Sequence, residues 1–229
     1  MTRVRNAEFR ADGAIVHASD AHVGRVDRLS NELPGVYASV VDVTDRGALA
    51  DYLDDVLARE GRVDVLVNCA GTNVVKPTWD LSDDEWDHVF DVNLDAVFRA
   101  TRAVLPGMLR RRSGAIVSIA SIAAWDPSPG EIAYSTSKAA LIAFTRAVAK
   151  EVAGTGVRVN AVAPSFVENP FLEKVYGPER LEQLRAAMPG GRGVLPEEVA
   201  ATVSWLAGDG SSFVTGETVT VAGGGFLRH

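Results

Sequence analysis

The chain has 229 residues, 47% of them hydrophobic and 23% charged, with a formal net charge of −7, four histidines and one cysteine. This composition predicts a single soluble domain, residues 1–229, and argues against binding to nucleic acid or to an anionic membrane. One cysteine excludes an internal disulfide, and the histidines lack the spacing of metal ligands, so no metal site is predicted. No apolar run is long enough to span a membrane and the polar N-terminus lacks a signal-peptide core, so we expect a cytoplasmic protein.

Short apolar runs alternate with amphipathic stretches along the chain. Runs that are apolar almost throughout and alternate with helices indicate a parallel sheet covered on both faces. Strands are predicted at Ala14–Ser19, Val36–Val41, Val63–Asn68, Ala115–Ile119, Val157–Val162 and Thr218–Val221. Helices are predicted at Val23–Leu33, Asp45–Glu60, Asp83–Asp91, Leu94–Arg111, Tyr134–Val152, Pro178–Ala187 and Pro196–Leu206.

Polar and glycine residues follow most of the predicted strands. They are Asp20, Asp42-Val43, Asn68 to Gly71, Ser121, and Pro164 to Val167. Each could be a plain turn when taken singly. Together they would lie at the carboxyl edge of one sheet, where open parallel sheets bind their ligands.

Tyr134 and Lys138 lie one turn apart at the start of a predicted helix, and Ser121 ends an apolar run that begins at Ala115. Residues at i and i+4 share one helix face. An ammonium beside a phenol can lower the pKa of the phenol from about 10 toward neutrality, so that it exchanges a proton with a substrate oxygen. Taken alone, the pair would be interpreted as a solvated surface contact.

Several motifs occur along the chain in a fixed order: Asp42-Val43, Asn68-Cys-Ala-Gly71, Asn93 in Val92-Asn-Leu94, Ser121, Tyr134-x-x-x-Lys138, Arg158-Val-Asn-Ala-Val-Ala-Pro164, Val214-Thr-Gly216 and Gly223-Gly224. With these motifs the chain resembles a short-chain dehydrogenase/reductase from Phe9 to Phe226. The resemblance implies a Rossmann-like, doubly wound parallel sheet in three α/β/α layers. It also implies an enzyme that transfers hydride between nicotinamide, NAD or NADP, and a secondary alcohol or ketone.

The resemblance also implies a role for each matching residue. Tyr134 would be the general acid and base, and Lys138 would lower its pKa and bind the nicotinamide ribose. Ser121 would hydrogen-bond the substrate oxygen, and Asn93 would bend its helix and hold a water of the proton relay. The other implied cofactor contacts are Asp42 and Val43 at the adenine, Asn68, Ala70 and Gly71 along the middle, with Asn68 also bracing adjacent strands, and Pro164 to Val167 beside the nicotinamide.

Asp20 falls at the end of the family's second strand. A carboxylate there accepts hydrogen bonds from the adenosine ribose and repels a 2′-phosphate, which favours NAD over NADP. The alternative is an N-cap for the helix that begins near Val23.

The family's first strand and its glycine-rich turn, which cradles the cofactor diphosphate at a helix N-terminus, are missing from the sequence. By length, Gly13 to Asp42 matches the second strand, second helix and third strand, and Arg3 to Asp12 the first helix. A second register lays Ala14 to Arg25 on the glycine motif, although only Gly24 would match a family glycine and His22 would crowd the diphosphate.

In the family order, 3-2-1-4-5-6-7, the missing strand is central, and its absence would leave a gap of about 9.6 Å between strands two and four. Unpaired backbone groups in such a gap are costly. Three outcomes are open: those strands close up and pair, Thr2 to Arg10 fill the gap, or the natural protein has residues upstream of Met1.

The substrate side is rich in aromatic residues. Trp125 to Gly130 would lie over the reacting centre, and Phe166, Phe171, Leu172, Tyr176 and Met188 belong to the family's lid segment. These residues suggest a moderately apolar alcohol or ketone, and are equally explained by packing of the lid. The family also pairs its two long helices with those of a neighbour, so a homodimer or homotetramer is expected.

Three functions are weighed on this basis. The first is the redox enzyme just described, with a small alcohol or ketone as substrate. The second is a non-redox protein on the same fold, such as an isomerase or dehydratase, motivated by the absent diphosphate cradle. The third is a binding or scaffold protein without catalysis.

Overall fold

The computed structural model describes residues 9, 13–168 and 177–227. The predicted elements are confirmed, with ends that differ by no more than two residues from those expected. The strands are β1 (Val16–Asp20), β2 (Val36–Val40), β3 (Val65–Asn68), β4 (Gly114–Ile119), β5 (Val157–Pro164) and β6 (Thr218–Val221). The main helices are α2 (Val23–Glu32), α3 (Arg46–Glu60), α4 (Asp83–Phe90), α5 (Ala96–Arg111), α6 (Ile132–Glu151), α8 (Pro178–Ala187) and α9 (Pro196–Ala207).

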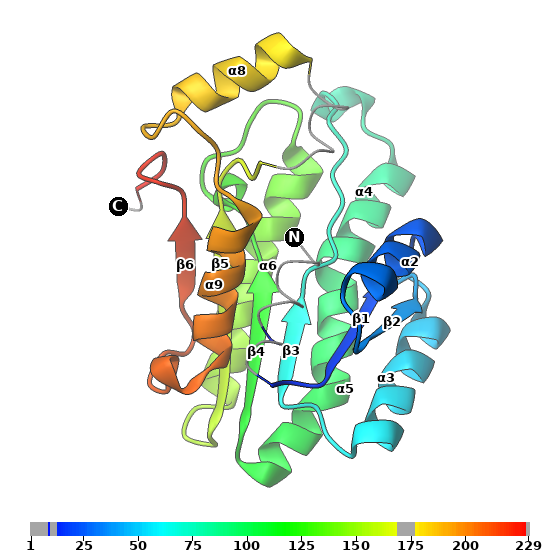
Figure 1. Ribbon diagram of the computed structural model, residues 1–229. Coiled ribbons are helices and arrows are strands. Elements are labelled where there is room, and N and C mark those ends of the chain that lie inside the picture. Colours follow the sequence, from blue (N-terminus) through cyan, green and yellow to red (C-terminus); the bar gives the residue numbers. More distant parts are fainter. Residues whose placement is uncertain (1–8, 10–12, 169–176, 228–229) are drawn as a thin grey trace.

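All strand pairs are parallel, as the apolar runs predicted. The strands form two separate sheets, one of order β1-β2 and one of order β3-β4-β5-β6, which lie beside each other in Figure 1. Because β1 pairs with β2, these two match the second and third strands of the family order. The register that lays Ala14 to Arg25 on the glycine motif would instead make β1 the neighbour of β3, and the observed pairing does not agree with it.

The sheet is interrupted where the first strand of the family would lie. Among the described residues, strands β1 and β3 are not paired with each other, so the alternative in which these strands close up and pair is not observed. All four residues of β3 are partly exposed, which is unusual for a strand that would be central in an uninterrupted sheet. Of Thr2 to Arg10, only Phe9 is described; it is helical, and its side chain packs against apolar clusters of both sheets.

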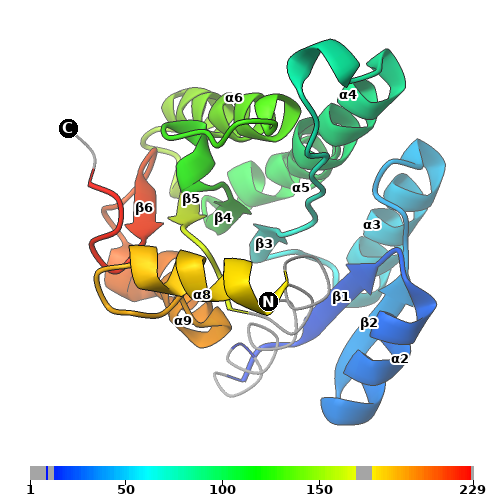
Figure 2. The same ribbon diagram turned by 90° about the horizontal axis from the view of Figure 1, so that it is seen from above.

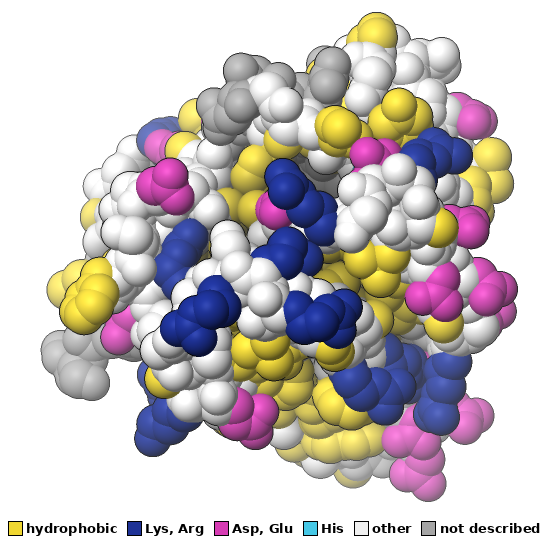
Figure 3. Space-filling view, turned by 90° about the horizontal axis from the view of Figure 1, so that it is seen from below, with side chains coloured by type: hydrophobic (Ala, Val, Ile, Leu, Met, Phe, Trp, Pro, Cys, Tyr) yellow, Lys and Arg dark blue, Asp and Glu magenta, His cyan; other side chains and the backbone are white. Residues whose placement is uncertain are grey.

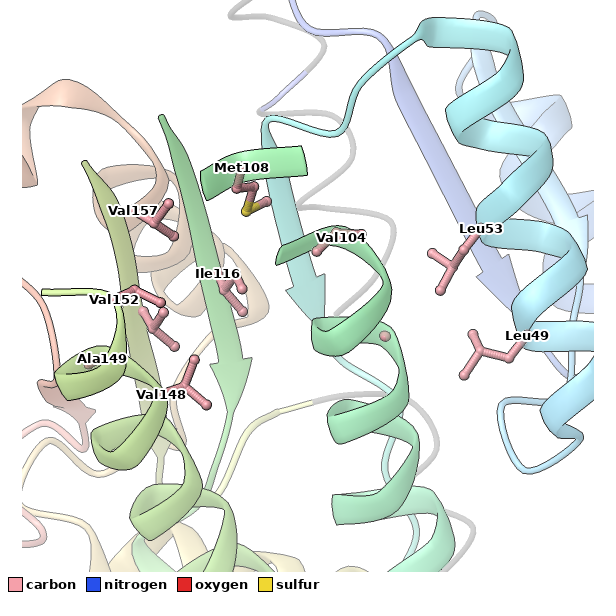
Figure 4. Packing of buried hydrophobic residues seen from close by; sticks show 11 residues of the cluster. Leu49, Leu53, Val104, Met108, Ile116, Val148, Ala149, Val152 and Val157 are labelled. Carbon is pink, nitrogen blue, oxygen red and sulfur yellow. The ribbon is translucent and has the colours of Figure 1, made fainter. Parts of the chain in front are cut away.

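Helices cover both faces of the larger sheet, which gives the predicted three layers (Figure 2). On one face, α3, α5 and α6 pack over the sheet through Leu53, Val104, Ile116 and Val148, among the residues shown in Figure 4. On the other face, α9 packs on β4 and β5 through Val199, Val203 and Leu206. Alternate residues of one strand serve the two cores, which explains why the strands are apolar almost throughout.

The smaller sheet is tied to the body through α3. The side chain of Ser19 on β1 forms a hydrogen bond with Tyr52 of α3. Burial raises the pKa of Tyr52 to about 12. His17 of β1 pairs with Glu60 at the end of α3, at 2.9 Å, and stacks on Tyr37 of β2. These contacts hold β1 and β2 at the edge of the molecule, in a sheet that is separate from β3 in the described part of the chain.

Loops at the amino ends of the strands are held by arginine side chains, and Lys and Arg gather on that face of the molecule (Figure 3). Arg111 donates to the carbonyl of Val63 before β3, and Arg112 donates to the carbonyl of Gly154 before β5. Arg111 and Arg112 therefore have a structural role in holding these loops. Within the described ranges, no helix combines the length and apolar character needed to cross a membrane.

Candidate active site

Asn93 lies fully buried in a π-helical turn, Asp91–Asp95, which joins α4 to α5. Its side-chain oxygen accepts the N–H of Thr72 at 2.9 Å, and its Nδ2 donates to the carbonyl of Thr72 and to Oγ of Ser137. The Ser137 hydroxyl in turn donates to the carbonyl of Tyr134 at 2.7 Å. Asn93 therefore fixes the loop after β3 to the first turns of α6, and these hydrogen bonds account for the irregular turn.

Lys138 is a buried ammonium at the carboxyl end of β4. Its Nζ donates to the carbonyl of Ile119 at 2.7 Å and lies 5.7 Å from the centre of the Tyr134 ring. Burial lowers the pKa of Lys138 to about 8. The interpretation of Tyr134 and Lys138 as an exposed surface pair is therefore wrong, because the lysine has almost no contact with solvent.

Ser121 precedes a short 3₁₀ turn, Ile122–Ala124, that packs against α6. Its Oγ accepts the backbone N–H of Ala123 at 3.2 Å, which leaves its own O–H to donate elsewhere. Because Ile119, whose carbonyl binds Lys138, is two residues before Ser121, the serine lies at the same edge of the sheet as the ammonium. Tyr134, Lys138 and Ser121 thus come from two elements that meet beyond the end of β4.

The end of β3 lies against the same group. Asn68 donates from Nδ2 to Oγ of Ser118 on β4 at 3.2 Å, which is the bracing of adjacent strands that the resemblance implied. A Cβ added to Gly71 would come 3.6 Å from both Asn93 Oδ1 and Lys138 Nζ. Ala70 and Gly71 are exposed, so the loop after β3 presents its backbone beside the ammonium.

Residues after β5 form the other side of the edge. Pro164 ends β5 next to Val221 of β6, and Val167 makes an isolated bridge with Val194. Glu168 follows and binds Arg185 of α8 through two hydrogen bonds of 2.9 Å, which hold its pKa below the usual value. The lid residues Phe171, Leu172 and Tyr176 lie outside the described residues.

The predicted adenosine residues lie on the smaller sheet. Asp20 is the last residue of β1, and its carboxylate accepts the N–H of His22 and lies 3.5 Å from Arg25. His22, not Asp20, is the N-cap of α2, so the N-cap alternative for Asp20 is wrong. After β2, Asp42 accepts two hydrogen bonds from Thr44, and these lower its pKa. Val43 is partly buried against the core under α3.

Two residues that contribute to the site were not predicted from the sequence. Thr72 and Ser137 hold Asn93 in place, and Ser137 is fully buried although it lies on a helix between two residues of the site. The sequence signal for Ser137 was its hydroxyl, which directly precedes Lys138 and lies on the inner face of the helix. It was not recognised because serine in a helix is more often a solvated residue.

The described residues fit the ribose and nicotinamide end of a dinucleotide. The ammonium of Lys138 uses one N–H on Ile119, so it can donate to ribose hydroxyls, and the side of Gly71 toward it is open to close approach. The carboxylate of Asp20 fits the adenosine ribose. In the part of the chain that the structure describes, no glycine-rich turn is available for the diphosphate between them.

Comparison with known proteins agrees with this geometry. Residues 6–225 match the family model described as enoyl-(acyl carrier protein) reductase. The chain is 41% identical over 221 residues, 94% of its length and 89% of the relative's, to a 3-oxoacyl-[acyl-carrier-protein] reductase of Thermotoga maritima.

Two further relatives have different substrates in their names. One is the (5R,7aS)-5-hydroxy-7a-methyl-1-oxo-2,3,5,6,7,7a-hexahydro-1H-indene-carboxyl-CoA reductase of Mycobacterium tuberculosis, 43% identical over 93% of this chain and 83% of the relative. The other is a 2-dehydro-3-deoxy-L-rhamnonate dehydrogenase (NAD(+)) of a Sphingomonas species, 36% identical over 95% of this chain and 88% of the relative.

Proposed function

Because the chain belongs to the short-chain dehydrogenase/reductase family, we propose that it interconverts a secondary alcohol and a ketone with Tyr134 as general acid and base. The observation that carries the proposal is the buried Lys138 ammonium beside the Tyr134 ring, on a helix whose first turn is anchored through Asn93 and Ser137. The relatives named above are two reductases and a dehydrogenase, which favours the redox enzyme over the non-redox alternative.

In reduction, the Tyr134 phenol gives its proton to the ketone oxygen, and in oxidation the phenolate takes it from the alcohol. The positive charge of Lys138 favours the phenolate form. Ser121 donates its O–H to the same substrate oxygen and so holds the carbonyl against the tyrosine. The nicotinamide, when bound, supplies or accepts the hydride.

Each remaining residue of the site acts by position. Lys138 would hold the hydroxyls of the nicotinamide ribose with its remaining N–H groups, while the carbonyl of Ile119 keeps the ammonium in place. Asn93 fixes the turn of α6 that carries Tyr134, and in our proposal a water beside it returns the proton to solvent. Asn68, Ala70 and Gly71 would line the middle of the cofactor, and Pro164 to Val167 would flank its nicotinamide.

Replacement of the tyrosine tests this proposal. Tyr134→Phe removes only the phenolic oxygen, and we expect the rate of ketone reduction with NADH to fall about 100-fold or more, because positioned acid–base groups contribute that much. Tyr37→Phe is the matched control, since Tyr37 is exposed on β2, away from the site. Full turnover by Tyr134→Phe would end the proposal.

We further propose NAD(H) as the preferred cofactor, because Asp20 ends β1 where it would repel a 2′-phosphate. The Sphingomonas relative has NAD(+) in its name, which agrees. Asp20→Ala should lower the ratio of the NADPH dissociation constant to the NADH dissociation constant by about tenfold, which corresponds to about 1.4 kcal/mol. Asp27→Ala, on the exposed side of α2, is the control, and an unchanged ratio in Asp20→Ala would contradict the role of Asp20.

A homodimer or homotetramer is proposed from the same family membership. Exposed aromatic side chains on two surfaces support this proposal. One surface carries Phe98 of α5, with the guanidinium of Arg102 over its ring, and the other carries Trp205 of α9 and Phe213. Phe98 also borders a cavity of about 550 Å³ between α3 and α5. Light scattering of the purified chain tests this, and a monomer at all concentrations would refute it.

A further inference from the structure

The residues after β6 return toward the candidate active site. Phe226 stacks on Trp125, with ring centres 5.5 Å apart and planes inclined by 15°. Trp125 closes the 3₁₀ turn that begins after Ser121, and its backbone N–H donates to the carbonyl of Ile122. A residue near the C-terminus is thus brought against the segment that carries the proposed substrate-binding serine.

Trp125 is attached to the helix face that carries the proposed catalytic pair. It packs on an apolar cluster that includes Ile142 of α6 and Ala163 of β5. Tyr134, Lys138 and Ile142 follow one another at intervals of four residues and therefore share one face of α6. The stacked rings consequently lie at the site edge of the sheet.

The other side of the C-terminal segment lies against the end of α8. A Cβ built on Gly225 would come 3.0 Å from the terminal methyl of Met188 and 3.1 Å from its sulfur. A Cβ on Gly224 would lie 3.9 Å from Pro189. Residues 222–226 therefore lie between the Trp125 loop and the segment after α8.

We propose that Phe226 is a specificity-determining residue of the proposed reaction, and that with Trp125 it forms an aromatic wall of the substrate site. Both residues are half-buried, so part of the wall is open to a ligand. Flat apolar groups pack favourably against aromatic faces. The wall therefore selects ketones that carry a flat apolar ring beside the carbonyl over small aliphatic ketones. This inference rests on the proposed ketone reduction.

The kinetic test compares acetophenone with 2-butanone. In Phe226→Ala, we expect kcat/KM for acetophenone to fall about tenfold, mainly through KM, while the value for 2-butanone changes by less than about threefold. Leu227→Ala, at the exposed neighbouring position, should leave both values unchanged. Phe226→Tyr should restore acetophenone, because it keeps the flat ring. An equal loss of kcat/KM for both ketones in Phe226→Ala, or no loss for either, would refute the proposal that Phe226 forms a wall of the substrate site.

A second measurement separates this inference from the proposed function. Saturation-transfer NMR without any nicotinamide should detect the phenyl protons of acetophenone on the unmodified chain and on Leu227→Ala, and give a clearly weaker signal on Phe226→Ala. Urea unfolding midpoints of the three proteins show whether Phe226→Ala is folded, and Phe226→Leu, which keeps the apolar volume, replaces it if it is not. Phenyl signal of equal strength on Phe226→Ala refutes the wall even if Tyr134 proves catalytic.

Discussion

Lys138 places a positive charge in the interior, and this should cost stability that can be measured by titration. Burial lowers its pKa from 10.5 to about 8. Each pH unit of such a displacement corresponds to about 1.4 kcal/mol. At pH 7, keeping Lys138 charged in the interior therefore lowers the free energy of unfolding by on the order of 3 kcal/mol, relative to a lysine whose pKa is the same in the folded and unfolded chains.

The sign of the pH dependence follows from proton binding. Between pH 8 and pH 10.5, the unfolded chain holds a proton on Lys138 that the folded chain has lost, so this lysine makes stability rise with pH. From pH 7 to pH 9.5, the unmodified chain should gain about 2 kcal/mol from this group. Lys138→Met removes the group and fills a similar volume, so the variant should lack that gain.

Urea unfolding at several pH values measures the difference between the two proteins. At pH 7 the variant loses the hydrogen bond to Ile119, which costs about 1–3 kcal/mol and offsets the relief of the buried charge. The lost hydrogen bond shifts the free energy of unfolding of the variant but does not enter its change with pH. Lys150→Met, exposed in the last turn of the same helix, is the control. A difference between Lys138→Met and the unmodified chain that stays constant from pH 7 to pH 9.5 would refute the reasoning.

Three further substitutions test other contacts. Asn93→Ala should destabilise the chain by about 2–4 kcal/mol in urea, because Thr72 loses both its partners, whereas exposed Asn73→Ala should cost much less. Glu168→Gln should cost about 0.5–1 kcal/mol at neutral pH and nothing once the pH falls below the lowered pKa of this carboxyl, where its pair with Arg185 is lost. Gly156→Ala should cost more than about 3 kcal/mol, since its Cβ would lie 2.0 Å from the carbonyl oxygen of Arg112, while Gly154→Ala, equally left-handed but open, should cost about 1 kcal/mol by thermal unfolding.

The elements and the close placement of Tyr134 and Lys138 could be predicted because their signals are local. Apolar runs bounded by turns specify the strands, and Tyr134 and Lys138 are spaced by one helical turn. The π-helical turn at Asn93 was not predictable in this way, because the helical pattern continues through it. Its cause is the pair of distant partners, Thr72 and Ser137, that the fold brings to the side chain.

Burial and long-range pairing were beyond the sequence for the same reason. The lysine of an i,i+4 pair is ordinarily exposed, and Lys138 is buried only because its face of α6 closes over the end of β4. The stacking of Phe226 on Trp125 depends on the path of the chain after β6. Neither segment has a pattern that indicates the other.

The interruption between β1 and β3 divides the molecule into two parts that need not open together. A sheet of two strands is marginal by itself, and β1 with β2 depends on α3 for its attachment. Backbone amides of β1 and β2 should therefore exchange with deuterium through local opening, well before those of β4 and β5. If Asp20 and Asp42 bind the adenosine, a dinucleotide would join the two parts, and its binding would be measured as slower exchange in the smaller sheet.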